Sequence, residues 1–204
     1  MEKQLINLCK EGKLEELKEF LKNNPNINIS ADNEKAFRLA ALNGHLEVLK
    51  FLLQQKPNIN ISENNERAFR NAALNGHLEV LKFLLQQKPN INISAYNEDA
   101  FRNAASNGHL EVLKFLLQQK PNIDISANNE QAFILAAANG HLEVLKFLLQ
   151  QKQDIDISAN NNEAFKNTTL NGHLSVLKYL LKLKPNINLQ LLNLSIYKNN
   201  NQII

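Results

Sequence analysis

The sequence has little of several residue types on which other classes of protein depend. Its 204 residues include one cysteine, Cys9, so the fold cannot depend on a disulfide within the chain. A single cysteine is typical of proteins kept in a reducing cytosol, and we interpret Cys9 as a small buried residue. The apolar stretch at the N-terminus is too short for a signal peptide. We therefore expect a cytoplasmic location.

Long hydrophobic runs and an excess of one charge are also missing. Lysines interrupt the longest apolar stretches before they reach the roughly 20 residues that span a bilayer, so we expect no membrane segment. The 23 Lys and Arg residues and 20 Asp and Glu residues leave a net charge of +3. Because the basic residues are spread along the chain rather than clustered, neither nucleic acid nor a membrane surface is an expected partner.

What the sequence does contain is a repeat. The tetrapeptide Asn-Gly-His-Leu occurs five times at a spacing of 32 residues, and long flanking stretches return with it almost unchanged. The five copies begin at Asn43, Asn75, Asn107, Asn139 and Asn171. A fixed period of this length indicates a solenoid, in which each unit packs against its neighbours and the row offers one long surface. Such a surface favours the binding of another molecule over chemistry in a closed pocket.

The unit 31–62 illustrates the pattern. We expect a first helix over residues 31–42, with Asn33 as its N-cap, because an Asn side chain can accept the free amide hydrogens of a first turn. Gly44 ends this helix, since glycine adopts left-handed backbone angles at little cost. A second helix is then expected from about residue 46 to residue 55, with valine and leucine as its buried stripe.

The end of the unit has a different pattern. Pro57 cannot continue the second helix, and residues 58–62 alternate polar and apolar side chains as a short strand does. We expect an extended finger here. Ile59 and Ile61 should point to the helices or to the neighbouring finger.

Helix, glycine turn, second helix and finger together resemble the ankyrin repeat. The match rests on Leu-Ala-Ala-Leu-Asn-Gly-His-Leu-Glu-Val over residues 39–48 and on Phe-Leu-Leu over residues 51–53. The resemblance implies an all-α, ankyrin-type helix-turn-helix solenoid with short extended β-hairpin-like fingers. The chain departs from the family in a period one residue shorter than the usual roughly 33. It also lacks the family's Thr-Pro-Leu-His opening, which is Lys-Ala-Phe-Arg at residues 35–38.

Residues 1–204 are expected to form one such solenoid. It begins with an N-terminal capping unit, continues through five repeats and ends with a partial C-terminal capping unit. These units are 1–30, 31–62, 63–94, 95–126, 127–158, 159–190 and 191–204.

We expect no enzyme activity, no cofactor and no metal site. The five histidines each follow a turn glycine. Packed helices lie about 8–10 Å apart, so equivalent histidines cannot share a zinc ion whose nitrogen ligands lie about 2 Å away. The family resemblance implies instead that this histidine bonds to neighbouring backbone. No catalytic triad, carboxylate pair or phosphate loop can be assembled from the residues that differ between units.

The candidates for binding are residues that vary while the helices around them do not. They recur at positions i, i+4 and i+7 of the first helix and so share one face, which in ankyrin proteins lines a concave groove together with the fingers. A series of arginines and the aromatic Tyr96 add residue types that are frequent in interface hot spots. The candidate partner-binding residues are Lys35, Arg38, Arg67, Arg70, Tyr96, Asp99, Arg102, Asn103, Gln131, Ile134 and Leu135. Variation at tolerant surface positions is the alternative explanation for each of them.

We therefore hypothesise a monomeric, non-enzymatic protein-protein interaction module that binds a protein partner through this groove. Two alternatives remain open. In the first, the chain is the interaction arm of a larger enzyme or host-directed effector whose catalytic domain lies outside these residues. In the second, it is a structural scaffold or an engineered consensus-like array. Ankyrin proteins with such units are similar to host-directed effectors of intracellular bacteria, which adds translocation into a host cell as a second hypothesis for location.

Overall fold

The computed structural model describes residues 1–187, which form twelve α-helices in six consecutive pairs. We call the members of each pair the first helix and the second helix. The helices are α1 (Glu2–Glu11), α2 (Leu14–Asn23), α3 (Ala31–Leu42), α4 (Leu46–Gln55), α5 (Glu63–Leu74), α6 (Leu78–Gln87), α7 (Ala95–Ser106), α8 (Leu110–Gln119), α9 (Ala127–Ala138), α10 (Leu142–Gln151), α11 (Ala159–Leu170) and α12 (Leu174–Leu183).

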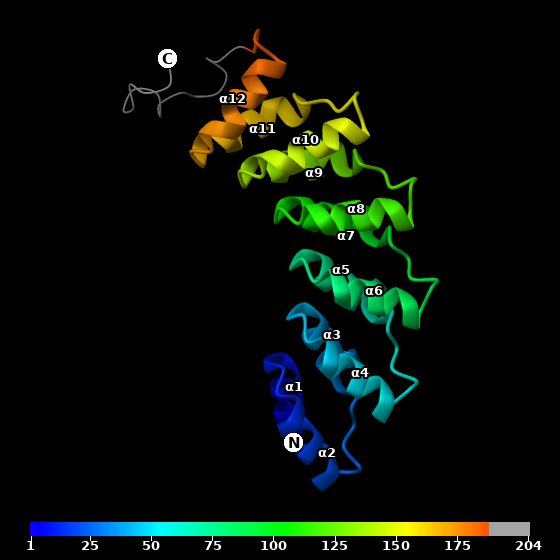
Figure 1. Cartoon of the computed structure of the whole chain (residues 1–204). Coiled ribbons are helices and arrows are strands. Elements are labelled where there is room, and N and C mark those ends of the chain that lie inside the picture. Colours follow the sequence, from blue (N-terminus) through cyan, green and yellow to red (C-terminus); the bar gives the residue numbers. More distant parts are fainter. Residues whose placement is uncertain (188–204) are drawn as a thin grey trace.

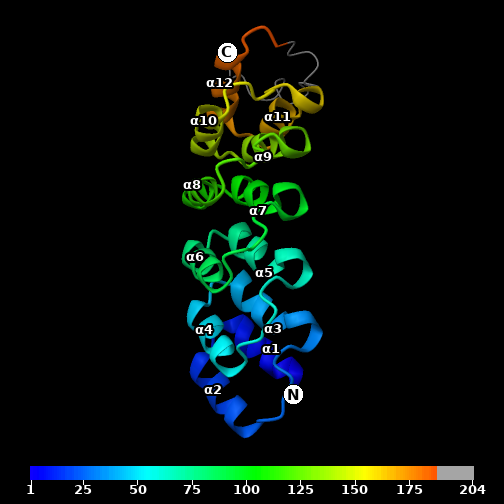
Figure 2. The ribbon, with the colours of Figure 1, turned by 90° about the vertical axis from the view of Figure 1, so that its right-hand side faces the viewer.

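The helix pairs stack in one curved row from the N-terminus to α12 (Figure 1). Each first helix packs against the first helix of the next pair, whereas successive second helices make fewer contacts. Figure 2 shows the two columns, with α4, α6, α8 and α10 on one side and the first helices beside them. The segments that connect the pairs all lie on one side of the row, along the outside of its bend in Figure 1. The all-α solenoid predicted from the sequence is therefore confirmed.

The core lies between the columns and is built alike in each central repeat. The first helix contributes a phenylalanine and three alanines, and the small alanine side chains let neighbouring first helices approach closely. The second helix contributes a valine and two leucines, each worth about 1.5–3 kcal/mol when fully buried. Leu53 of the same helix, one of the leucines expected in the buried stripe, is only half-buried. The core residues of the α3–α4 pair are Ala36, Phe37, Ala40, Ala41, Val48, Leu49 and Leu52.

A glycine and a histidine join neighbouring pairs. Gly44 has a φ of 77°, and a Cβ placed on it would lie 2.6 Å from Nδ1 of His77 in the next pair, so glycine alone fits there. Nε2 of His77 lies 3.0 Å from the carbonyl oxygen of Leu42. Because a carbonyl oxygen only accepts hydrogen bonds, Nε2 carries the proton. Equivalent backbone bonds, as the family resemblance implied, are made by His45, His109 and His141.

Two local predictions are wrong. Residues 58–62 form no strand: Asn58, Ile61 and Ser62 lie in turns, Ile59 and Asn60 have no regular secondary structure, and residues 1–187 as a whole contain no strand. The Asn60 amide donates to the Glu34 carboxylate at 3.2 Å. Asn33 is no N-cap, because it lies inside a turn with left-handed backbone angles (φ 55°, ψ 57°). The predicted burial of Ile59 and Ile61 is confirmed, at 6% and 8% exposure.

The predicted partial unit 191–204 lies outside the described residues. Within the part of the chain that the structure describes, no helix is both long enough and apolar enough to cross a bilayer.

Candidate partner-binding surface

Three consecutive residues with left-handed backbone angles open each first helix from α3 onward. In α3 they are Asp32, Asn33 and Glu34, with φ of 54°, 55° and 58°. For residues other than glycine this conformation costs roughly 1–2 kcal/mol each, so the surroundings must hold it in place. We call these segments the left-handed turns. The others are Asn64–Glu66, Tyr96–Glu98, Asn128–Glu130 and Asn160–Asn162.

Arginines one turn further along the first helix hold three of these turns. Arg38 donates from Nε to the carbonyl oxygen of Asn33 at 2.7 Å and from Nη2 to that of Asp32 at 3.0 Å. Arg70 and Arg102 bond the carbonyl oxygens of their own turns in the same way, at 2.7–3.2 Å. The arginines predicted as partner contacts therefore already have a structural role.

The fourth and fifth repeats lack this arginine. Ile134 stands at its position in α9 and is 3% exposed, so it presents almost no surface to a partner. Lys166 stands at the same position in α11.

The sequence prediction did not include a set of glutamates that occupy the last position of four left-handed turns. Glu34 is 7% exposed, and its Oε1 accepts the amide hydrogen of Asn60, which belongs to the segment leading into the next repeat. The equivalent bonds run from Asn92 to Glu66, from Asp124 to Glu98 and from Asp156 to Glu130. The available signal was one Glu recurring at the same position in four repeats, with Asn162 in the fifth.

Five of the predicted residues form one network across α5, α7 and α9. Nη1 of Arg70 lies 2.7 Å from Oδ2 of Asp99, and Nη2 of Arg102 lies 3.3 Å from Oδ1 of the same carboxylate. Nη1 of Arg102 donates to Oε1 of Gln131 at 2.5 Å. The Arg70 guanidinium carbon also lies 4.5 Å from the ring centroid of Tyr96, within the range of a cation–π contact.

The other predicted residues lie around this network without joining it. Lys35 pairs with Asp32 at 2.6 Å on the exposed surface. Arg67 is exposed. The pKa of Arg38 is lowered mainly by the burial of Arg38 and secondly by the positive charge of Arg67. Asn103 and Leu135 are half-buried on α7 and α9, respectively.

A hollow of about 320 Å³ opens beside Tyr96, between the second and third left-handed turns. We call it the Tyr96 hollow. Its lining residues are Ser62, Asn65, Glu66, Asn92, Ala95 and Tyr96.

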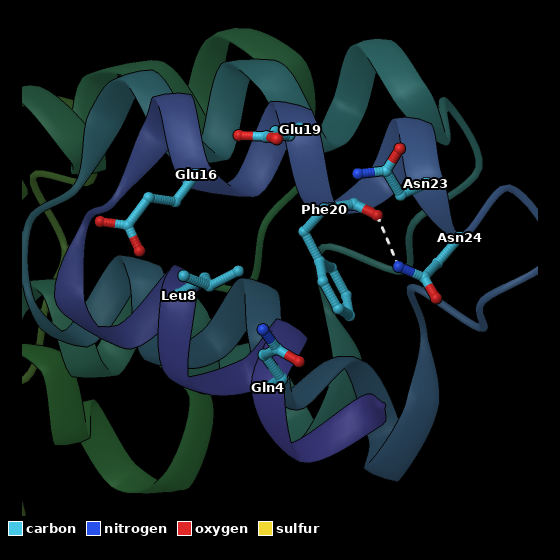
Figure 3. A pocket seen from close by; sticks show the side chains of 7 residues that line it. All are labelled: Gln4, Leu8, Glu16, Glu19, Phe20, Asn23 and Asn24. Atoms are coloured by element: carbon cyan, nitrogen blue, oxygen red, sulfur yellow. Dashed lines mark hydrogen bonds between the residues drawn. The ribbon is translucent and has the colours of Figure 1, made fainter.

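A second hollow, of about 270 Å³, lies at the N-terminal end of the row between α1 and α2 (Figure 3). Leu8 and Phe20 form its apolar part, and Glu16 and Glu19 lie on its rim. Asn24 donates from Nδ2 to the carbonyl oxygen of Phe20 at 2.8 Å. None of the predicted contact residues lies in this hollow, so the network on α5, α7 and α9 is the candidate site.

Comparison with known proteins identifies the repeat. The family model "Ankyrin repeats (3 copies)" matches residues 5–97, 71–161 and 101–191. The crystal structure of the human ASB11 ankyrin repeat domain is similar, with a TM-score of 0.67 and 18% identity over 90% of this chain and 85% of that chain. No curated protein matched the sequence. At this identity the solved structure supports the fold alone.

Repeats of this kind are generally protein-protein interaction modules. Because the three matches of the family model together extend from residue 5 to residue 191, the chain belongs to the ankyrin repeat family.

Proposed function

We propose that the chain binds a protein partner through the face of its first helices that the sequence predicted as the groove, with Tyr96 at the centre of the contact. The observation that carries this proposal is the exposure of Tyr96, at 59%. The other large hydrophobic side chains exposed among residues 1–187 lie near the two ends of the row, where a neighbouring repeat is missing on one side. Tyr96 is exposed in the middle of the row instead.

The surroundings of Tyr96 support the same conclusion. Its carbonyl oxygen accepts a hydrogen bond from Arg102, and its ring lies against Arg70, so both backbone and side chain are positioned before any partner arrives. An aromatic side chain that is already ordered loses little conformational entropy on binding. Asp99 and Gln131, which bond Arg70 and Arg102, add polar groups to its surroundings, as the rim of an interface surrounds a hot spot.

The test is a titration against a partner captured from cell lysate, with Tyr96→Asn as the variant. Asparagine already occupies the equivalent position at Asn64 and Asn128, so the left-handed turn should keep its shape. Loss of a hot spot should weaken binding by at least about 2 kcal/mol, or about 30-fold. Arg70→Ala and Arg102→Ala are less informative variants, because both arginines also hold the turns.

Lys114→Ala on α8 is the matched control. Lys114 is exposed on a second helix, where it pairs with Glu111 at 2.6 Å, and its removal should change the affinity by less than about tenfold. Circular dichroism should show both variants folded. Unchanged affinity in Tyr96→Asn, or a larger loss in Lys114→Ala, would move the binding site away from the first helices.

We further propose that the chain acts as a monomer, without catalysis, in the cytoplasm. The single buried cysteine supports a reducing compartment. A dimer mass in light scattering would contradict the monomer. The alternative, an interaction arm of a larger enzyme or host-directed effector, predicts that the natural gene encodes a catalytic domain outside residues 1–204, and sequencing the full gene distinguishes the two.

A further inference from the structure

Every buried glutamate of the left-handed turns keeps one carboxylate oxygen without a hydrogen-bond donor. Oε1 accepts an amide hydrogen from the segment that leads into the next repeat, but Oε2 of Glu34, Glu66, Glu98 and Glu130 is buried and unpartnered within the described chain. A buried acceptor without a donor costs about 1–3 kcal/mol, and more when it is charged. These oxygens are therefore places where a donor, and above all a cationic one, would be stabilised.

The chain itself shows which group is accommodated beside these turns. Nζ of Lys56 donates to Oγ of Ser30, the residue before the first left-handed turn, at 2.6 Å. Nζ of Lys120 donates to Oγ of Ser94 and lies 3.8 Å from Oε1 of Glu98. At these turns a lysine ammonium from the end of the next second helix lies beside the serine.

The second and fourth turns differ. Lys88 is the equivalent lysine at the second turn, yet among residues 1–187 it forms no hydrogen bond to Ser62 and no ion pair with Glu66. At the fourth turn Lys152 pairs with Asp154 at 2.8 Å instead, and Oγ of Ser126 and Oε2 of Glu130 are likewise buried and unpartnered. Both Oγ of Ser62 and Oε2 of Glu66 are buried and unpartnered, and both residues line the Tyr96 hollow. This hollow therefore combines two free acceptors, one of them on a carboxylate that is 7% exposed.

Tyr96 gives the hollow a wall that the equivalent turns lack. The matching residues beside the first, third and fourth turns are Asn64, Asn128 and Asn160. An aromatic ring can pack against the aliphatic stem of a lysine and attract its ammonium group. Arg70 lies on the same ring, but Asp99 pairs with its guanidinium at 2.7 Å, which offsets that positive charge.

We propose that the Tyr96 hollow is a subsite for a lysine side chain of the protein partner, with the ammonium group bound by Glu66 and Ser62 and the stem against Tyr96. This rests on the proposed function and names the chemistry that the partner presents at its centre. The partner's lysine would take the place beside the turn that Lys56 and Lys120 take at the first and third turns.

The experiment is an amide NMR titration of the full chain with N-acetyl-lysine methylamide. The reporter is the amide of Asn92, which donates to Glu66 Oε1, and the internal references are the amides of Asn60 and Asp124 at the first and third turns. We expect a saturable shift of Asn92 with a dissociation constant in the millimolar range, as for a single side chain. The references should shift much less. N-acetyl-norleucine methylamide, which has a similar stem without the ammonium group, should produce no saturable shift.

Three variants make the test specific. Glu66→Gln retains an acceptor for the Asn92 amide but loses the charge, and it should weaken probe binding at least about fivefold. Glu98→Gln is the matched control at the third turn and should leave the Asn92 titration unchanged. Tyr96→Asn should weaken binding as Glu66→Gln does. Thermal melts establish that all three variants are folded.

Several results would overturn the subsite. These are equal shifts with the norleucine probe, equal shifts at the first and third turns, or an Asn92 titration that Glu66→Gln leaves unchanged. Binding that appears only after Lys88→Met would show that Lys88 fills the hollow and would also reject the proposal. If Tyr96→Asn weakens partner binding while the probe does not bind, the subsite fails but the proposed function stands.

Discussion

The first three full repeats and the last two differ in how they hold the same strained turn. In α3, α5 and α7 an arginine bonds two carbonyl oxygens of the left-handed turn, whereas α9 has Ile134 and α11 has Lys166 at that position. Yet the backbone angles of all five turns are nearly the same. The arginine is therefore not what creates the turn. Packing of the repeat and the asparagines, which tolerate left-handed angles, are sufficient for its geometry.

The core does not share this difference. The second helices α4, α6, α8 and α10 have the same sequence, Leu-Glu-Val-Leu-Lys-Phe-Leu-Leu-Gln-Gln. Among the five full repeats, α11 alone replaces core alanines of the first helix, with Thr168 and Thr169. Both hydroxyl groups are satisfied, with Thr168 donating to the carbonyl oxygen of Ala137 at 3.0 Å and Thr169 to that of Phe165 at 2.8 Å. The comparison teaches that the repeats share one core and differ in the polar contacts of their turns.

The largest effect tests whether the cores of the two regions are equivalent. Leu84 on α6 and Leu148 on α10 are both fully buried, so Leu84→Ala and Leu148→Ala should each cost about 2–5 kcal/mol by leaving a cavity. Urea unfolding followed by circular dichroism measures both costs. An unchanged midpoint in either variant would show that its leucine is not a core residue.

The next effect concerns the arginine itself. The Arg102 side chain is 11% exposed, and Arg102→Met should cost about 1–3 kcal/mol because the turn loses two charge-assisted hydrogen bonds. Ile134→Met is the matched control, and an apolar replacement of similar size should cost less than about 1.5 kcal/mol. Urea melts compare the two. Equal costs would mean that the arginine contributes nothing beyond its volume.

A third prediction concerns which end opens first. The fifth repeat lacks both the arginine and the buried glutamate, so amide hydrogens of α11 should exchange at least about tenfold faster than those of α3. Mass spectrometry of matched peptides measures this. Faster exchange in α3 than in α11 would contradict this prediction.

Burial raises the pKa of Cys9 to about 12, so a thiolate-specific reagent should label Cys9 only when the N-terminal helix pair opens.

The smallest expected effect depends on pH. Burial lowers the pKa of His109 below its ordinary value of 6.5, so the unfolded chain takes up this proton more readily than the folded chain. The resulting loss of stability begins as the pH falls through 6.5 and is complete below the folded pKa. His109→Gln should therefore narrow the difference between melting temperatures at pH 7.5 and pH 5.5. A wider difference in the variant would contradict the assignment.

The sequence predicted what the period and the helical pattern determine. The positions of glycine and proline place the helix ends, and the recurring apolar residues identify the core of each repeat. The left-handed turns were not predictable in the same way, because they contain no glycine and the pattern of residues 32–34 also suits a helix start. The Asn-rich pairs, such as Asn64 and Asn65, were the only local signal for left-handed angles.

The candidate surface was predicted in part. The sequence identified Tyr96 and the varied positions of the first helices, and the structure brings five of these residues into one network. The sequence could not show that each arginine bonds its own turn, because these bonds depend on carbonyl oxygens that the left-handed backbone angles direct toward the arginine. The buried glutamates were missed for a similar reason, because their partners lie 26 residues away in the segment that leads into the next repeat.

The contacts between glycine and histidine have a consequence for how such a chain can change length. The ring of His77 packs over Gly44, and that of His109 packs over Gly76. Each repeat therefore supplies a glycine for the contact with the next repeat and a histidine for the contact with the preceding one. After duplication or deletion of a block of 32 residues, every glycine–histidine contact can therefore form again without any compensating substitution. Gly172 has no histidine ring over it within the described residues. Variation in repeat number should consequently be tolerated more easily than the replacement of a single turn glycine.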